Sequence, residues 1–180
     1  MSEVTYYKVL VRGRRSCHGG TADWEKGVWM PPITGELIPC KNGYHLCRRG
    51  DLIHWLHDEI WEAEGRGEME EAENKVVVRE ARITRKLTRW TRKNKRLFAA
   101  DCAEHVLHLF ESRYPDDPRP REAIQAARAY AVGKIGKKEL AAAWFAAWDA
   151  AGSAAWSAAE AERELQTNRL FHYLDREVEG

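Results

Sequence analysis

The chain has 180 residues, of which 29 are basic and 28 are acidic, so its formal net charge is close to zero. This balance gives no whole-molecule field that would attract nucleic acid or an anionic membrane. The sequence has no apolar run near the roughly 18 residues that a membrane-spanning helix needs, and its start lacks the apolar stretch of a signal peptide. We therefore expect a cytoplasmic protein that does not bind membranes.

The first half of the chain has the pattern of a small β-sheet. Residues 5–11 are mostly β-branched and aromatic, which is typical of a strand. A loop rich in glycine and proline follows over residues 12–35. Two short strands, joined by an Asn-Gly turn, are expected next at residues 36–39 and 44–47, because both turn residues tolerate positive φ.

A short helix and a pair of strands complete this half. Asp51 is expected to cap a helix over residues 52–57, since its carboxylate can accept hydrogen bonds from free backbone N–H groups. Residues 60–64 and 75–83 have strand character, which is clearest in the run of three valines in the second segment. The acidic stretch 68–73 is expected to form a solvated hairpin loop between them.

The second half of the chain changes to helical periodicity. After about residue 94, apolar side chains recur every three or four positions. Prolines interrupt the pattern over residues 114–120, and a second helix is expected from about Arg119 to a glycine cap at Gly133. An alanine-rich helix is expected from Lys137 to about Leu174. Three of its tryptophans fall on one helical face: Trp144, Trp148 and Trp156.

These patterns predict an α+β protein with two domains. A small antiparallel sheet occupies the β-rich domain, residues 1–92, and an alanine- and tryptophan-rich helical bundle occupies residues 95–176. The boundary is expected near residues 92–97, where the periodicity changes from two residues to between three and four.

Cysteine and histidine residues gather in the first half. Five of them fall within 31 positions, in loops and short strands where ligands could converge on a zinc ion. The alternative is ordinary buried thiols and hydrogen-bonded histidines. The metal candidates are Cys17, His18, Cys40, His45 and Cys47.

A basic run extends over residues 79–96, with nine lysines or arginines and one glutamate. Such side chains neutralise phosphates, and an aromatic ring among them can stack on a base. The alternative is a connector whose charges are solvated or pair with the acidic stretch 68–73. The nucleic-acid candidates are Arg85, Lys86, Arg89, Trp90 and Arg92.

Two stretches of the sequence resemble known families. The motifs YKVLVRG, SCHGG and PCKNGYHLC make residues 6–87 resemble a domain of unknown function in phage and actinobacterial proteins. The motifs KRLFAADCAEHVL and RPREAIQAARAYAVGKI, with the following alanine run, make residues 95–174 resemble the helical module of bacterial immunity proteins. These resemblances imply a role in phage–host or toxin–immunity conflict.

A third resemblance is to ADP-ribosyltransferases. The segment GYHLC followed by DLIHWL is similar to the strand and helix beside the NAD site of those enzymes, and His18-Gly19 is similar to the dipeptide that opens it. This implies NAD as cofactor, with His18, Tyr44 and His45 as catalytic candidates. The sequence places no glutamate in the role that stabilises the ribose charge.

The functional expectation is a protein-binding module, acting as an immunity, inhibitor or anti-defence protein on a partner protein. The chain has no glycine-rich phosphate loop and no Gly-x-Ser-x-Gly elbow. An NAD-using transferase and a nucleic-acid-binding protein are the two alternatives. We expect no cofactor for the protein-binding module, whereas zinc belongs to the metal hypothesis and NAD to the transferase hypothesis.

Overall fold

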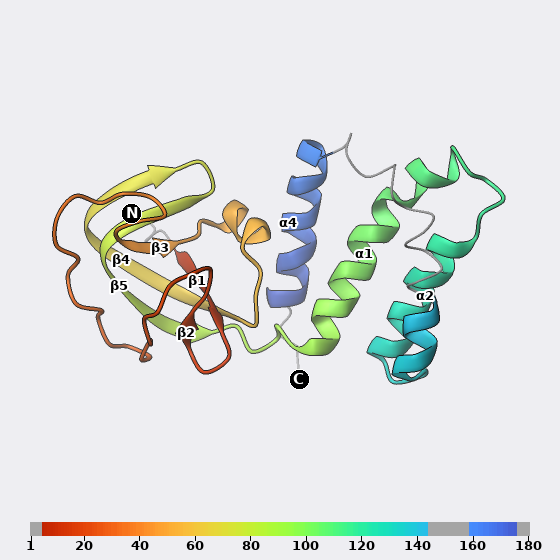
Figure 1. Ribbon diagram of the computed structural model, residues 1–180, viewed down its shortest axis with the longest axis horizontal. Coiled ribbons are helices and arrows are strands. Elements are labelled where there is room, and N and C mark those ends of the chain that lie inside the picture. The colour runs from red at the N-terminus through yellow and green to blue at the C-terminus, as the bar shows by residue number, and fades with distance from the viewer. Residues whose placement is uncertain (1–4, 144–158, 176–180) are drawn as a thin grey trace. The chain divides into compact units, whose positions relative to one another are not determined.

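The computed structural model describes residues 5–143 and 159–175, which belong to two compact units (Figure 1). The first unit ends at Trp90 and the second begins at Thr91. The described strands all lie in the first unit, and helices follow in the second. The predicted α+β class, with an antiparallel sheet followed by helices, is confirmed.

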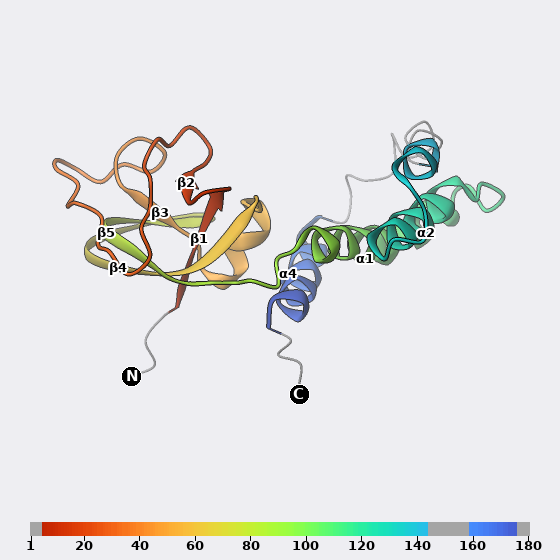
Figure 2. The same cartoon turned by 90° about the horizontal axis from the view of Figure 1, so that it is seen from below.

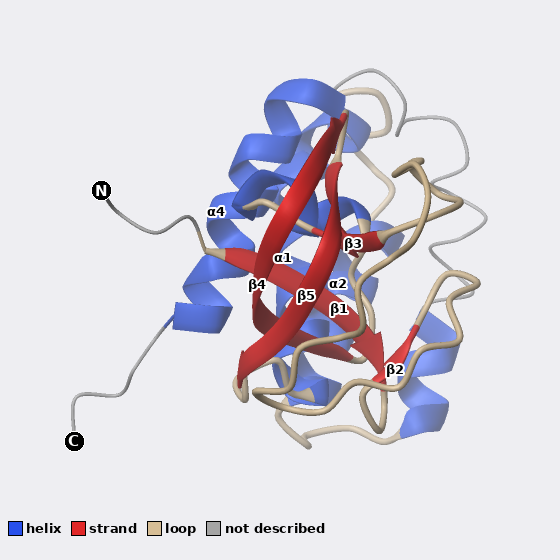
Figure 3. Ribbon diagram, turned by 90° about the vertical axis from the view of Figure 1, so that its left-hand side faces the viewer, coloured by secondary structure: helices blue, strands red, loops and turns tan. Residues whose placement is uncertain are grey.

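A long hairpin forms the centre of the sheet. Strand β4 (Glu59–Ala72) pairs antiparallel with strand β5 (Lys75–Lys86), and the two lie side by side in Figure 3. The three valines at the start of β5 are buried, because β-branched side chains pack well on a pleated surface that is covered. The register shifts along β4, between Trp61 and Ala63 and again between Arg66 and Met69. Such irregularities bend a strand and increase its twist.

Three shorter strands extend the sheet on both sides of the hairpin. The strand order is β2-β1-β4-β5-β3. Strand β1 (Tyr6–Val11) pairs with β4 and also with β2 (Arg15–Ser16), while β3 (Tyr44–Leu46) pairs with β5. All of these pairings are antiparallel, as the sequence predicts.

The sheet curls until the residue after β3 meets β1. Tyr7 of β1 and Cys47, just after β3, exchange two backbone hydrogen bonds of 2.8 Å each. The side chains that face inward form the core of this unit: Leu10, Trp24, Leu46, Trp61, Ala63, Val76, Val78, Ala81 and Ile83.

The acidic stretch 68–73 is mostly strand, so the prediction of a hairpin loop there was wrong. Strand β4 runs on to Ala72, and the turn consists of Glu73 and Asn74. A strand forms here although its glutamates are exposed, because one of them, Glu68, forms an ion pair with Arg79 on β5.

The expected hairpin between residues 36–39 and 44–47 is also wrong. The first segment makes only an isolated bridge, between Ile38 and Asn42. The Asn42 side-chain amide donates to the carbonyls of Thr34 and Glu36, at 2.9 and 2.8 Å, and so holds the loop in place of a strand ladder. Strand β3 pairs with β5 instead. Gly43 permits this approach, since a Cβ there would lie 2.1 Å from a Val77 methyl group.

The short helix after β3 is a 3₁₀ helix, η1 (Arg49–His54), rather than the predicted helix over residues 52–57. Asp51 lies inside it and not at its N-cap. Its carboxylate accepts hydrogen bonds from the Arg48 backbone N–H at 2.9 Å and from Arg48 Nε at 2.8 Å. The same side chain therefore secures the start of the helix from the third helical position, as an acidic residue in a capping box does.

The second unit contains helices α1 (Arg92–Glu111), α2 (Arg119–Ala131) and α4 (Ala159–Asp175). Helices α1 and α2 lie side by side (Figure 2) and pack through Ala100, Leu107 and Ile124. The predicted break before Arg119 and the predicted cap at Gly133, whose φ is +76°, are confirmed.

The alanine-rich segment is described only in part. Residues 137–143 are helical, and α4 covers the last part of the predicted helix. The three tryptophans expected on one face, Trp144, Trp148 and Trp156, lie outside the described residues. None of the described helices is long and apolar enough to cross a membrane.

A buried carboxylate connects the three helices. Asp101 of α1 is only 7% exposed, and it pairs with Arg128 of α2 at 2.6 Å and with Arg169 of α4 at 3.1 Å. The Tyr173 hydroxyl donates to the same carboxylate at 2.7 Å. Burial and the Asp101 contact raise the pKa of Tyr173 to about 12, so the hydroxyl keeps the proton that it donates. A buried charge of this kind is stable only with such partners.

We expect Asp101→Ala to lower the free energy of unfolding by about 2 kcal/mol, because it removes the shared acceptor of three charge-assisted bonds. The change is measured as the urea midpoint of the helical circular dichroism signal. Glu111→Ala is the control, since it removes the more exposed ion pair with Arg121 and is expected to change stability by under about 1 kcal/mol. Equal effects of the two substitutions would contradict a structural role for the Asp101 cluster.

Candidate functional site

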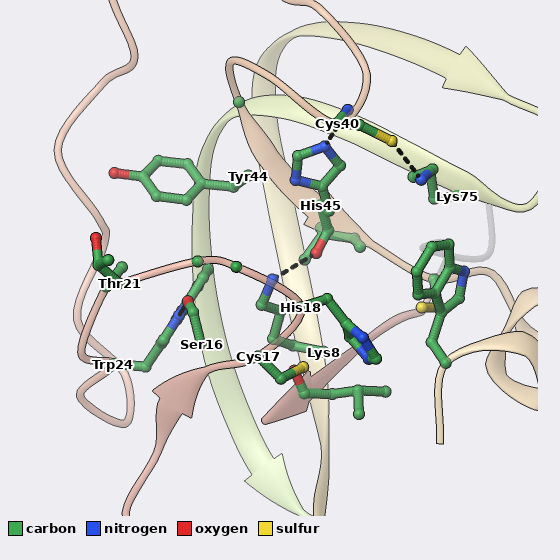
Figure 4. Close-up of a pocket in the computed structure, with 18 of the residues that line it drawn as sticks. Lys8, Ser16, Cys17, His18, Thr21, Trp24, Cys40, Tyr44, His45 and Lys75 are labelled. Atoms are coloured by element: carbon green, nitrogen blue, oxygen red, sulfur yellow. Dashed lines mark hydrogen bonds between the residues drawn. The ribbon is translucent and has the colours of Figure 1, made fainter. Parts of the chain in front are cut away.

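A pocket of about 410 Å³ lies on the inner side of the curled sheet (Figure 4). Its walls come from β1, from the loop at residues 16–22 and from the segment 40–47. The bridge between Tyr7 and Cys47 holds that segment beside β1, so the curl of the sheet creates the pocket.

The structure brings the predicted metal and catalytic candidates of the first half together. All six residues line the pocket: Cys17, His18, Cys40, Tyr44, His45 and Cys47. Their backbone is strained at two points. His18 has φ +54° and Cys40 has φ +65°, in a region that residues with a side chain rarely adopt. Strain of this kind costs on the order of 1–3 kcal/mol per residue and is common at functional sites.

The cysteines and histidines are engaged in separate contacts. Cys17 Sγ donates to the Val9 carbonyl at 3.3 Å, and His45 Nε2 accepts from the Cys40 backbone N–H at 2.9 Å. Within residues 5–143 and 159–175, no group of three or more His, Cys, Asp or Glu side chains is arranged to hold a metal ion. Zinc binding stays a prediction, and metal analysis of the purified protein tests it.

Two of the three pocket thiols, Cys17 and Cys47, are poor nucleophiles. Burial raises the pKa of the Cys47 thiol to about 12 and also raises the pKa of Cys17. Since the thiolate is the reactive form, both groups are inert near neutral pH.

His45 is held as a neutral imidazole. Burial, together with the charges of Lys8 and Lys75, lowers the pKa of His45 to about 4. Because Nε2 accepts the Cys40 hydrogen bond, the ring proton is assigned to Nδ1.

Lys8 is one of the pocket residues, with Lys75, that the sequence did not predict. It lies on β1 between Tyr6 and Leu10, and these alternate residues share the face of the strand that packs on the core. Its Nζ donates to the His45 carbonyl at 2.8 Å and lies 5.0 Å from the centre of the Trp24 ring. Burial lowers the pKa of Lys8. A lysine at an inward position of a strand was the signal that could have found it.

Aromatic side chains line the same pocket. Trp24 packs edge-on against Tyr44, with ring centres 5.5 Å apart, and His18 packs edge-on against Trp55 at 5.3 Å. Lys75 Nζ lies 4.3 Å from the centre of the Trp55 ring. We call these four rings, His18, Trp24, Tyr44 and Trp55, the aromatic wall.

The three catalytic candidates of the transferase hypothesis line one pocket, but no acidic side chain among the described residues lines it with them. Among the described residues that line the pocket, none is Asp or Glu. The Tyr44 hydroxyl donates to the Pro31 carbonyl at 2.8 Å, which occupies its proton. The arrangement offers cationic and N–H groups, and the exposed Cys40 thiol accepts from Lys75 Nζ at 2.9 Å.

The basic run 79–96 is paired within the protein over its first half. From residue 79 to the end of β5, each cation contacts a glutamate on β4 across the hairpin, as opposite charges on neighbouring strands are expected to do. The pairs are Arg79–Glu68, Arg82–Glu64, Arg85–Glu62 and Lys86–Glu59. This favours the interpretation of paired charges, although most of the partners precede the stretch 68–73.

The other nucleic-acid candidates lie at the end of β5 and the start of α1. Trp90 is 8% exposed, and its indole N–H donates to the His57 carbonyl at 2.9 Å, so its ring is covered. Arg89 is half-buried, while Arg92 is exposed and begins α1. No described aromatic ring in this run stands exposed for stacking on a base.

We expect His45 to make the protein less stable as the pH falls. Between pH 6.5 and about 4 the unfolded chain binds a proton at this ring that the folded chain does not. The loss is about 1–2 kcal/mol, because solvent screens a ring that is partly exposed. His45→Gln, which keeps an acceptor for the Cys40 N–H, should show a correspondingly smaller fall in urea midpoint. An unchanged pH dependence would contradict a neutral His45.

We expect iodoacetamide to modify Cys40 in the native chain at pH 8 and to leave Cys47 unmodified. Cys40 is exposed, whereas Cys47 is buried. With a pKa of about 12 for Cys47, only about one molecule in ten thousand carries that thiolate at pH 8. Mass spectrometry of the digested protein measures both, and urea-unfolded chain is the control. Equal labelling rates in the native chain would contradict the assignment.

Comparison with known proteins gives one family match. The family described as Imm-5 like putative immunity protein matches residues 85–163, which is less than half of the chain. Searches of curated proteins and of solved structures found no match. The predicted resemblance of the C-terminal half to immunity proteins is thereby supported, whereas that of residues 6–87 to a phage domain has no support. The match begins beyond every residue of the pocket, so it relates the helical part of the chain to immunity proteins.

Proposed function

We propose that this chain is an immunity-type protein that binds a partner protein and blocks its action by covering its surface. The observation that carries the proposal is the family match over residues 85–163. Toxin–immunity or phage–host conflict is the setting that we propose for it.

The surface of the helical unit supports protein binding. Leu109, Tyr114 and Val132 are 38%, 39% and 49% exposed, although each is a large apolar or aromatic residue. Tyr114 also packs against Phe110, with ring centres 5.0 Å apart, so its ring is held in place before any partner binds. Aromatic anchors that are already ordered lose little entropy on binding and are common at interface centres.

The chemistry of the β-rich unit agrees with a role in binding. Two of its pocket thiols, Cys17 and Cys47, have raised pKa values, His45 is neutral, and its described lining has no carboxylate. Enzymes that transfer groups need an activated nucleophile or a general base.

The test is capture followed by protection. Tagged full-length chain is expressed in its host, and a partner is expected to co-purify at close to one copy per copy of the chain. Expression of that partner alone should inhibit growth, and co-expression of the chain should restore it.

Two variants locate the surface. The double substitution Leu109→Asp and Tyr114→Ala is expected to abolish capture and protection, with an unchanged circular dichroism spectrum. Val28→Asp is the matched control, because Val28 is 49% exposed but lies in the β-rich unit. A partner that does not inhibit growth, or no stoichiometric partner, would refute the proposal. Protection lost only with Val28→Asp would place the partner's contact outside the helical unit.

A further inference from the structure

Lys8 is a cation that the protein withdraws from water without giving it a counter-ion. Its ammonium group is half-buried on the inner face of β1, and Figure 4 shows it directed toward β3, where it donates to the His45 carbonyl. No described carboxylate lies within ion-pair distance of it. Its remaining neighbours are the Trp24 ring and the thiols of Cys17 and Cys47, which carry no formal charge near neutral pH. A buried charge without a partner is costly.

Lys75 adds a second such cation to the same pocket. Its Nζ donates to Cys40 Sγ at 2.9 Å and lies over the Trp55 ring, and it too has no carboxylate partner among the described residues. The charges of both lysines lower the pKa of His45, so both act on one point in the pocket.

Four cations elsewhere on the sheet differ from Lys8 and Lys75 in having carboxylate partners. On the β4–β5 hairpin, four cations of β5 each have a glutamate of β4 as partner. These four hairpin cations outside the pocket therefore have carboxylate partners, whereas Lys8 and Lys75 in the pocket have none among the described residues. The pocket has an excess of positive charge and, in His45 Nδ1–H, an additional donor.

The size and lining of the pocket restrict what could neutralise this charge. A volume of about 410 Å³ is within the usual range for small-molecule sites, of roughly 300–1,000 Å³. A single carboxylate or chloride would leave most of it empty. Within the aromatic wall, Trp24 is 3% exposed and belongs to the core. The half-buried rings of Tyr44 and Trp55 and the exposed ring of His18 provide the aromatic surface near the two ammonium groups, which suits a planar ring that carries an anionic group.

We propose that this pocket binds a phosphate-bearing small molecule of the nucleotide class, with its phosphate at Lys8 and Lys75 and its planar ring against the aromatic wall. Lysine is a common ligand of phosphate, as a point charge with several donors. The proposal is independent of the immunity-type role, because no pocket residue falls within the segment that matches the immunity family.

The test is calorimetric titration of the full chain with ADP, inorganic phosphate and adenosine, at low and at high salt. ADP is expected to bind and to bind more weakly at high salt, and adenosine is expected not to bind. Weaker binding of phosphate alone would show that the planar ring contributes. Equal binding of phosphate and ADP would overturn the nucleotide assignment.

Three variants connect binding to the pocket. Lys8→Met and Lys75→Met should each weaken ADP binding about tenfold or more. Lys26→Met, at an exposed lysine outside the pocket, should leave it unchanged. Ligand-free Lys8→Met should keep or raise the urea midpoint of the parent chain, because it removes an unpaired, half-buried charge. A lower midpoint with ADP affinity retained would show that Lys8 is structural and would overturn the proposal.

Two further outcomes would also overturn it. One is the absence of binding by ADP and phosphate at millimolar concentration. The other is binding of an acidic peptide at Lys8 and Lys75 without binding of phosphate compounds, which would assign the pocket to a protein partner. Neither outcome affects the growth-protection test of the immunity-type proposal. The nucleotide proposal and the immunity-type proposal can therefore be refuted separately.

Discussion

The pair of backbone hydrogen bonds between Tyr7 and Cys47 is the constraint on which the β-rich unit depends. Each is 2.8 Å long, and together they join β1 to the end of β3 across the curled sheet. They hold the segment 40–47 beside β1, which turns the inner face of the sheet into a pocket. They also place Lys8 of β1 beside the carbonyl of His45. One long-range backbone contact therefore both forms the pocket and brings the Lys8 ammonium group into it.

The two units of the chain have different chemistry. In the helical unit, the buried carboxylate Asp101 is matched by Arg128 and Arg169, and the surface carries exposed apolar side chains. In the β-rich unit, the pocket lysines Lys8 and Lys75 have no described carboxylate partner. The first pattern suits a rigid scaffold that binds a protein, and the second suits a site that an anion completes.

Local patterns predicted much of the fold. Three local patterns depend on near neighbours in the sequence: the β-branched and aromatic run at residues 5–11, the helical spacing after residue 94 and the prolines before Arg119. The elements that they predicted are confirmed. Long-range pairing decided the rest. Strand β3 pairs with β5, 30 to 34 positions away. Strand β4 continues through the acidic stretch because the start of β5 pairs with it, and Glu68 there forms an ion pair with Arg79. The gathering of cysteines and histidines marked the pocket, while Lys8 was hidden within an ordinary strand pattern.

The protonation of Lys8 tests the central claim, that the pocket holds positive charge which the protein does not neutralise. An NMR titration of the Lys8 side chain in the full-length protein measures it directly. We predict that Lys8 is protonated at pH 7 in the ligand-free chain with a pKa below 10.5, and that this pKa rises when ADP is added. A ligand-free Lys8 with a pKa of 10.5 or above would show that its charge is already balanced and would contradict the account.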